Sequence, residues 1–287
     1  MAEFPSRIVC LTEETTETLY RLGEDARIVG VSGYTVRPPE ARQKPRVSAF
    51  TTARFDAILA LQPDLVLTFS DLQADITAEL VRRGLAVFNF NQRSIEEIFA
   101  MMATVARLVG AQARGAALAD ELRRGLDAIA ASGARFSRRP RVLFEEWRDP
   151  LITGIRWVEE LIALAGGEPI FPELSREQSA RQRIVDPASV VERDPEVIIA
   201  SWCGQKVNKR AIAARPGWDR ISAVRAGHIY EIKSTYILQP GPAALTEGVR
   251  QLHALLAHAA GAEVPAGLEP EQRQDPDLLR ARGARTA

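Results

Sequence analysis

The sequence has few of the features that mark several large classes of protein. Its 287 residues include only two cysteines, Cys10 and Cys203, so a disulfide framework is excluded and at most one bridge stays open. No run of about 18 apolar residues occurs, so we expect no transmembrane helix. Lys plus Arg and Asp plus Glu both number 37, and this neutral total gives no support to a nucleic-acid or anionic-membrane partner. No phosphate-binding loop, metal-ligand spacing or catalytic triad signature is found.

The composition that is present is that of a globular protein. The chain is 46% hydrophobic and 26% charged, and its length suits roughly two domains. The first apolar run begins at Ile8, which leaves no room for the apolar segment of a secretory signal. We therefore expect a cytoplasmic protein as the chain is written, and a periplasmic one if the true start lies upstream.

Short apolar runs alternate with helical patterns along most of the chain. Strand, helix and strand in this order predict parallel βαβ units. The pattern stops at a predicted helix from Gln112 to about Ala131, which would be about 30 Å long. It resumes with a strand at Val142–Glu145. The expected strands are 8–11, 28–31, 65–69 and 86–90 before this helix, and 142–145, 197–201 and 228–232 after it.

A ten-residue pattern occurs twice. Residues 58–67 read ILALQPDLVL and residues 190–199 read VVERDPEVII, so the second copy lies 132 residues after the first. In both, a helix ends at a proline and an acidic residue leads into a buried strand. The repeat predicts two related lobes joined by a helix. The predicted parts are an N-terminal lobe 1–110, a connecting helix 111–133, a C-terminal lobe 134–262 and a disordered tail 263–287.

The same offset of 132 takes the pair Glu13–Glu14 to the pair Glu145–Glu146. Ligands of parallel α/β sheets gather at the carboxyl ends of the strands, where both pairs are expected. Up to four carboxylates there would favour a cation or a ligand with amide donors. For Glu13–Glu14 the alternative is a helix start capped by Thr12 and favoured by the helix dipole. No helix start follows Glu145–Glu146, so a role in binding is more open there.

Aromatic and basic residues lie near the second glutamate pair. Trp147, Trp157 and Trp202 are expected near one strand edge, although each can also belong to the core. Arg156, with Lys206 and Lys209, can neutralise the glutamates or contact a phosphate or carboxylate of a ligand, the alternative being a solvated surface.

Four segments carry a resemblance to a known family. They are VGVSGYTVRPPEARQKPRV (29–47), ILALQPDLVLTF (58–69), ITGIRWVEELIALAGGEPIF (152–171) and RPGWDRISAVRAGHIYEI (215–232). In this order they resemble the cobalamin- and ferric-chelate-binding proteins of ABC importers, over about residues 7–260. The resemblance implies an α/β fold of two Rossmann-like lobes with parallel sheets, joined by a long backbone α-helix.

The resemblance also implies a function. Such proteins hold a bulky metal chelate and carry out no reaction, so we expect a binding protein for cobalamin or another corrinoid, with no catalytic residue, protein-bound metal or resident cofactor. Aromatic residues that pack on the corrin correspond here to Tyr34, Phe69 and Tyr236, since flat rings supply large apolar faces. The predicted ligand-binding residues are Glu13, Glu14, Tyr34, Phe69, Glu145, Glu146, Trp147, Arg156, Trp157, Trp202 and Tyr236.

The resemblance names an ABC permease as a partner, but the sequence departs from the pattern. Importer receptors offer an acid on each lobe to the permease; Asp75 stands near the first place, and the second reads Tyr236–Pro240 with no acid. We expect a monomer that inserts into no membrane. The alternative function is a cytoplasmic metal-handling protein or enzyme that uses a glutamate-rich cleft.

Overall fold

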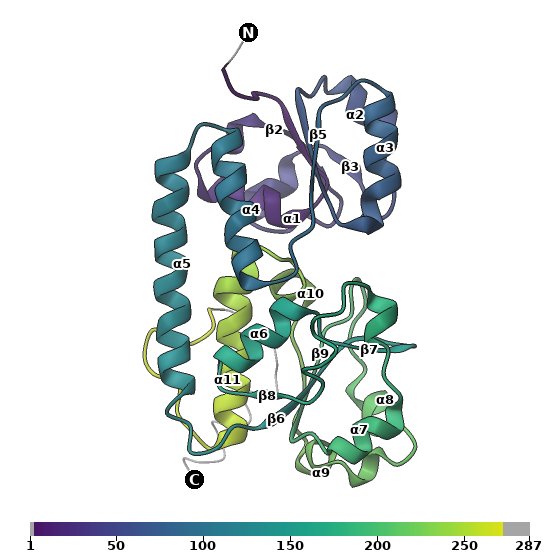
Figure 1. Ribbon diagram of the computed structural model, residues 1–287, viewed down its shortest axis with the longest axis vertical. Coiled ribbons are helices and arrows are strands. Elements are labelled where there is room, and N and C mark those ends of the chain that lie inside the picture. Colours follow the sequence, from purple (N-terminus) through teal and green to yellow (C-terminus); the bar gives the residue numbers. More distant parts are fainter. Residues whose placement is uncertain (1–2, 272–287) are drawn as a thin grey trace. The chain divides into compact units, whose positions relative to one another are not determined.

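The computed structural model describes residues 3–271, which fall into two compact units. Of the described residues, unit 1 comprises 3–92, Glu96–Leu122 and Gln239–Pro242. Unit 2 comprises Arg93–Ile95, Arg123–Leu238 and 243–271. The helix α5 (Gln112–Gly133) contributes its first half to unit 1 and its second half to unit 2 (Figure 1).

Unit 1 contains a five-stranded sheet in which every paired neighbour is parallel. The strand order β3-β2-β1-β4-β5 reverses direction at β1, as in doubly wound α/β folds. The strands are β1 (Ile8–Cys10), β2 (Ile28–Ser32), β3 (Arg46–Ser48), β4 (Leu65–Phe69) and β5 (Val87–Phe90).

Helices cover the sheet of unit 1 because its strands are apolar on both faces. Val9, Leu11 and Val66 pack with Ile58 and Leu80 of two helices in one buried cluster. Successive strand residues point to opposite faces, so Cys10 lies on the other face, near Thr15 and Thr16 of α1. The helices of the unit are α1 (Glu13–Arg21), α2 (Phe55–Ala60), α3 (Ala74–Arg82), α4 (Ile95–Leu108) and the first half of α5.

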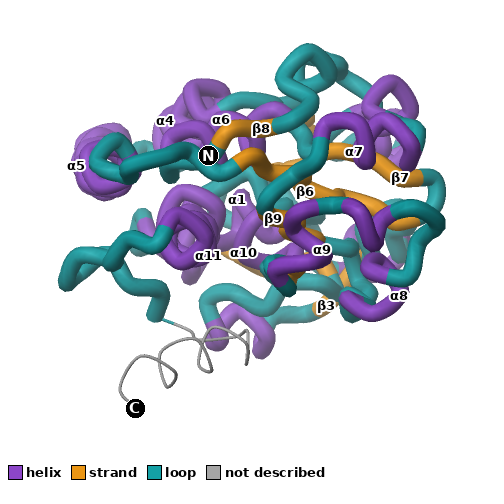
Figure 2. The backbone as a smooth tube through the Cα atoms, turned by 90° about the horizontal axis from the view of Figure 1, so that it is seen from below, coloured by secondary structure: helices purple, strands orange, loops and turns teal. Residues whose placement is uncertain are grey.

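Unit 2 contains a second five-stranded sheet, with the order β10-β9-β6-β7 and β8 paired to β6. Figure 2 shows β6, β7 and β9 among its strands. One strand, β7, runs antiparallel to β6, a hairpin that the sequence analysis did not predict. The strands are β6 (Arg141–Arg148), β7 (Leu151–Thr153), β8 (Glu168–Pro169), β9 (Val197–Ala200) and β10 (Ile229–Glu231).

The two faces of the second sheet have different coverings. Leu143 and Ile198 join Val190, Ile212 and Ala223 of α7, α8 and α9 in one core cluster. On the other face Gly167 lies against Val142, Ile162 of α6 and Leu256 of α11, so close that an added Cβ would be 2.9–3.0 Å from all three. The helices are α6 (Arg156–Leu164), α7 (Pro187–Arg193), α8 (Lys209–Ala213), α9 (Ser222–Ala226), α10 (Ser234–Ile237), a π-helix (Ala244–Gly248) and α11 (Val249–Ala260).

The predicted elements agree with the observed ones for the long, strongly apolar segments. The strand at 65–69 has the expected bounds, while β6 extends to Arg148, three residues beyond the prediction. Three short strands, β3, β7 and β8, were not predicted, whereas the three-residue strands β1 and β10 were. Of the predicted disordered tail, 272–287 lies outside the described residues; in 263–271 no helix or strand occurs, and Glu271 donates a backbone hydrogen bond to Glu247 (2.9 Å).

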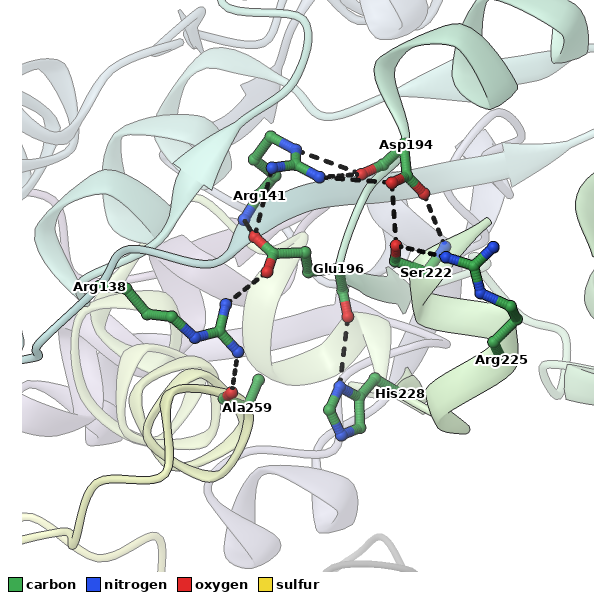
Figure 3. A network of polar contacts seen from close by, with 8 residues as sticks. All are labelled: Arg138, Arg141, Asp194, Glu196, Ser222, Arg225, His228 and Ala259. Carbon is green, nitrogen blue, oxygen red and sulfur yellow. Dashed lines mark hydrogen bonds and ion pairs between the residues drawn. The ribbon is translucent and has the colours of Figure 1, made fainter. Parts of the chain in front are cut away.

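The amino-terminal end of the second sheet is held by a polar network (Figure 3). The backbone N–H of Arg141 donates to Glu196 (3.0 Å), and its guanidinium donates to the carbonyl of Asp194 at the end of α7 (2.7 Å). Asp194 adopts a left-handed conformation (φ 43°), and its carboxylate accepts from the backbone N–H and hydroxyl of Ser222. One cluster thus fixes the start of β6, the end of α7 and the start of α9.

Unit 1 contains the same device at the same end of its sheet. The backbone N–H of Arg7 donates to Asp64 (2.9 Å), and its guanidinium donates to the carbonyl of Leu61 at the end of α2 (2.6 Å). Gln62 has a φ of 47°, like Asp194 at the matching position. The repeat detected in the sequence is therefore a repeated structural unit, in which an acid and an arginine tie a helix end to two strands.

The offset of 132 does not extend to the first strands, and this corrects the sequence analysis. Ile8 pairs with Leu65 and Val142 pairs with Val197, so the first strands correspond at an offset of 134. The segment between the paired strands is two residues shorter in unit 2. Glu145 and Glu146 consequently correspond to positions 11 and 12, and not to the pair at 13 and 14.

Candidate functional site

The carboxyl edges of the two parallel sheets are the places where the topology expects a ligand. On unit 1 this edge carries the start of α1. Glu13 and Glu14 are both buried there. Thr12 occupies the N-cap position, but its hydroxyl donates to Glu14 Oε1 (2.6 Å) and not to a backbone N–H. The predicted Thr12 side-chain cap is therefore wrong, although the helix start was correctly located.

Burial dominates the electrostatics of this pair. It raises the pKa of Glu13 to about 7 and that of Glu14 to about 8. The helix dipole favours the ionised form at this position, but desolvation of the carboxylates outweighs it. Glu14 Oε2 is buried without a hydrogen-bond partner. Near neutral pH, Glu14 is thus mostly protonated and Glu13 about half protonated.

A distant segment closes over Glu14 within unit 1. A Cβ added to Gly241 would lie 2.5 Å from the Cβ of Glu14, so only glycine fits. Gln92 anchors the same segment by donating from Nε2 to the carbonyl of Pro240 (3.0 Å). Nearby on α1, Glu17 forms an ion pair with Arg37 (3.2 Å).

Two apolar side chains are left exposed at the carboxyl edge of unit 1. Tyr34, in the loop after β2, is 50% exposed, and Leu72, shortly after β4, is 61% exposed. Phe69, the last residue of β4, is in contrast buried in the unit. Of the aromatic residues predicted on this unit, Tyr34 presents its ring to the surroundings. Leu72 was not singled out from the sequence, because an isolated leucine in a loop carries no signal.

At the carboxyl edge of unit 2, Glu145 is fully buried and ion-paired. Its two oxygens accept from Arg215 at 2.6 and 2.8 Å, and Oε1 also accepts from the indole N–H of Trp202 at 3.1 Å. The guanidinium of Arg215 stacks over Trp218, 4.5 Å from the ring centre. Glu145 therefore has a partner for both oxygens inside the unit.

Glu146 points to the other face of the sheet and meets a second arginine. Arg183 donates to both of its oxygens, at 2.6 and 3.1 Å, and to the carbonyl of Thr153 at 2.5 Å. Burial raises the pKa of neighbouring Glu159 to about 8, against the opposing effect of Arg183. Glu159 lies so close to Gly154 that an added Cβ would be 2.1 Å from Oε1.

The remaining predicted residues of unit 2 are mostly buried. Trp157 donates its indole N–H to the carbonyl of Ile237 (2.9 Å) and packs inside the unit, as do Trp202 and Tyr236. Trp147 is half-buried and donates to the carbonyl of Asp149 (3.1 Å). Arg156 is exposed and paired with Glu160 one helical turn on (2.8 Å).

The structure therefore brings together fewer of the predicted ligand-binding residues than the sequence suggested, and it adds residues that were not predicted. Within unit 2, Glu145 and Glu146 are adjacent in β6 and are each neutralised by an arginine, Arg215 or Arg183, that the sequence analysis did not single out. Among residues 3–271 no group of three or more His, Cys, Asp or Glu side chains is arranged to hold a metal ion. Over the same residues, no helix has the length and apolar character to cross a membrane.

Comparisons with known proteins agree on one family. The sequence model of the periplasmic binding protein family matches residues 8–236 of this chain. A cobalamin-binding protein of Halobacterium salinarum is 28% identical over 245 residues, which cover 83% of this chain and 66% of that protein. A vitamin B12-binding protein of Vibrio parahaemolyticus is 25% identical over 85% of this chain and 88% of its own length. An ABC transporter substrate-binding lipoprotein of Bacillus subtilis is 25% identical over 86% and 79%.

Solved structures share the fold. The periplasmic vitamin B12-binding protein of Vibrio cholerae superposes with a TM-score of 0.71 at 24% identity, covering 89% of this chain and 98% of that one. The apo form of a periplasmic heme-binding protein of Roseiflexus sp. RS-1 gives a TM-score of 0.78 at 24% identity, covering 89% and 99%. At this identity the likeness carries the architecture, and proteins named for different chelates share it.

Proposed function

The chain belongs to the periplasmic binding protein family, and from this premise we propose that it binds a corrinoid, cobalamin first among them. The family and the relatives are substrate-binding proteins, so the protein is a binding protein and not an enzyme, as the sequence predicted. The chelate is cargo in this proposal, and no resident cofactor is needed.

The observation that carries the proposal is the exposure of Tyr34 at the carboxyl edge of unit 1. A half-exposed tyrosine beside a Pro-rich loop, with exposed Leu72 at the same edge, offers apolar surface to a flat macrocycle. The names of the Halobacterium and Vibrio relatives support a corrinoid over other chelates. The other predicted contacts (Glu13, Glu14, Phe69, Glu145, Glu146, Trp147, Arg156, Trp157, Trp202 and Tyr236) remain predictions.

A transporter role is part of the proposal. The Bacillus subtilis relative is named as an ABC transporter substrate-binding lipoprotein, which supports an ABC permease as partner and a location outside the cytoplasm. This is the second of the two locations expected from the sequence. Asp75, at the start of α3, is exposed and available for docking.

The metal-handling alternative has no comparable support. It needs at least three donor side chains around one point, and the part of the chain that the structure describes contains no such group. Glu145 and Glu146, its main candidates, are already paired with Arg215 and Arg183.

Titration with corrinoids tests the proposal. Cyanocobalamin and dicyanocobinamide should give saturable changes in absorbance or heat that correspond to one site per chain. The protein should elute as a monomer in size-exclusion chromatography. Tyr34→Ala should weaken binding about tenfold, the ratio that corresponds to 1.4 kcal/mol of aromatic contact. Phe88→Ala removes an exposed aromatic from the middle of edge strand β5 and should leave affinity unchanged. Flat titrations with both corrinoids would overturn the proposal.

A further inference from the structure

This inference rests on the proposed function and concerns what the carboxyl edge of unit 2 selects. We infer that Glu146 neutralises Arg183 so that this edge accepts chelates with amide groups on their periphery and rejects those with carboxylates. Glu146 is then a residue that determines ligand specificity, a role that the names of the relatives do not indicate.

Arg183 is a buried cation with a single anionic partner. Its side chain is only 2% exposed, and both hydrogen bonds to Glu146 are short enough for a bidentate pair. The third bond goes to a neutral carbonyl, that of Thr153, and Nε has no partner. Without Glu146 the guanidinium would carry an uncompensated charge into the binding edge.

Glu159 lies beside this pair but does not share its charge near neutral pH. Its carboxyl is buried, Oε1 has no hydrogen-bond partner, and its pKa is raised to about 8. At pH 7 about nine-tenths of such a group is protonated. Burial is the main cause of that rise in pKa, and Glu146 adds to it by charge repulsion, so the removal of Glu146 would let Glu159 ionise in part.

Glu146 is the member of the pair that a ligand can reach. Its side chain is 20% exposed, ten times the exposed fraction of Arg183, and it follows the last residue of β6 that pairs with β9. A carboxylate whose two oxygens accept from arginine keeps lone pairs that can accept from further donors. Amide N–H groups supply such donors, whereas a ligand carboxylate would face the negative charge of Glu146, and Arg183 is already paired with that charge.

The two classes of chelate differ in this respect. The corrin of cobinamide carries neutral carboxamides around its ring, and unamidated cobyrinic acid carries carboxylates on the same ring. Haem carries two propionates. The inference predicts that the wild-type protein binds dicyanocobinamide more tightly than dicyanocobyrinic acid, and that Glu146 is the main cause of the difference.

Four variants test whether Glu146 itself causes this preference or whether any loss of a negative charge would do so. They are Glu146→Gln, Glu159→Gln, the double variant Glu146→Gln/Glu159→Gln and the control Glu173→Gln. Glu173 pairs with Arg193 on an exposed part of unit 2 and acts on Glu159 less than Glu146 does, so the control adds the same charge without removing the partner of Arg183. Each variant is titrated at pH 7 with the two dicyano-corrinoids, after its folding has been checked by circular dichroism.

The double variant should shift the ratio of the two affinities toward cobyrinic acid by about tenfold, equal to 1.4 kcal/mol. The single Glu146→Gln should shift the ratio by about threefold, because Glu159 then ionises in part and offsets some of the charge of Arg183. This variant carries the test if the double variant does not fold. Glu159→Gln and Glu173→Gln should leave the ratio within twofold. A wild type that binds cobinamide while the Glu146 variants keep the wild-type ratio would overturn the inference and leave the proposed function intact. Shifts of equal size in Glu173→Gln would also overturn it.

Discussion

The two units follow one plan at the amino ends of their strands and different plans at the carboxyl ends. At the amino ends, Arg7 donates to Asp64 and to the carbonyl of Gln62, and Arg141 donates to the matching residues Glu196 and Asp194. At the carboxyl ends, Glu13 and Glu14 of unit 1 lie buried without an ion pair to any arginine of the described residues, while Glu145 and Glu146 of unit 2 are bound by Arg215 and Arg183.

This difference indicates that the amino ends of the strands maintain the fold, whereas the carboxyl ends serve ligand recognition. The amino ends tie helices to strands, and a repeated backbone needs the same ties in both copies. The carboxyl ends meet the ligand in folds of this kind, so their side chains are not bound to a common pattern. The acids of unit 1 avoid the cost of burial by keeping their protons, and those of unit 2 avoid it by pairing. The predictions below test these two solutions and then the shared plan.

Loss of the arginine partner should have the largest effect. Arg215→Met leaves Glu145 as a fully buried carboxylate with only the indole of Trp202, and breaking a buried pair in this way costs about 3–5 kcal/mol. We expect the melting temperature at pH 7 to fall by about 10 °C in scanning fluorimetry. The control Arg82→Met, which breaks an exposed pair with Glu79, should change stability by less than about 1 kcal/mol. Equal losses in the two variants would mean that unit 2 does not rely on pairing.

Replacing Glu14 in unit 1 should have an effect of intermediate size, seen in how the stability of the protein depends on pH. The folded protein holds a proton on Glu14 up to about pH 8, whereas the unfolded chain releases it near 4.5. The folded state binds more protons between these values, so its stability falls as pH rises through that window. Glu14→Gln cannot ionise and should be more stable than wild type at pH 8.5, on the order of 3 kcal/mol, with little gain at pH 4.5.

Melting temperatures measured at steps from pH 4.5 to 8.5 would check this. Glu79→Gln, which removes an exposed acid from the same unit, should keep the wild-type slope. A Glu14→Gln variant whose stability still falls with pH in parallel with wild type would contradict the protonated state of that carboxyl.

Changes to the arginine networks at the amino ends of the two sheets should have the smallest effects on stability, and these effects should be similar in the two units. Arg7→Met and Arg141→Met each remove side-chain hydrogen bonds to the last carbonyls of a helix, at a cost of about 1–2 kcal/mol. Chemical unfolding should place the two variants within about 0.5 kcal/mol of each other, which is within the usual error of such measurements. A large difference between them would show that the two amino ends resemble each other in geometry but not in energy.

The sequence predicted the fold where local patterns decide it. Leu65–Phe69 is a strand because four apolar residues and one threonine follow a proline and an acid, and that information is contained in ten residues. The hairpin of β6 and β7 was missed because Leu151–Thr153 is too short to show periodicity. The equivalence of the glutamate pairs was wrong because a two-residue length difference is invisible until strand register is known.

The site was less predictable than the fold because its contacts join residues that are far apart in the sequence. Arg183 lies 37 residues from Glu146 and Arg215 lies 70 residues from Glu145, and neither arginine differs from a surface residue in its local pattern. The exposure of Tyr34 could be expected, because a large ring between Gly33 and a Pro-rich loop is poorly placed for the core; its role in binding stays a prediction.

The four residues Gln239–Pro242 complete unit 1 although the rest of it ends at Leu122. The ribosome must therefore add more than a hundred further residues before the segment that covers Glu14 exists. At about 5–20 residues per second this takes roughly 6–25 s, during which the start of α1 lacks its final cover. Unit 1 is thus completed only shortly before α11 completes the helices of unit 2. A nascent chain stalled before Gly241 would present an open, acid-lined surface to chaperones.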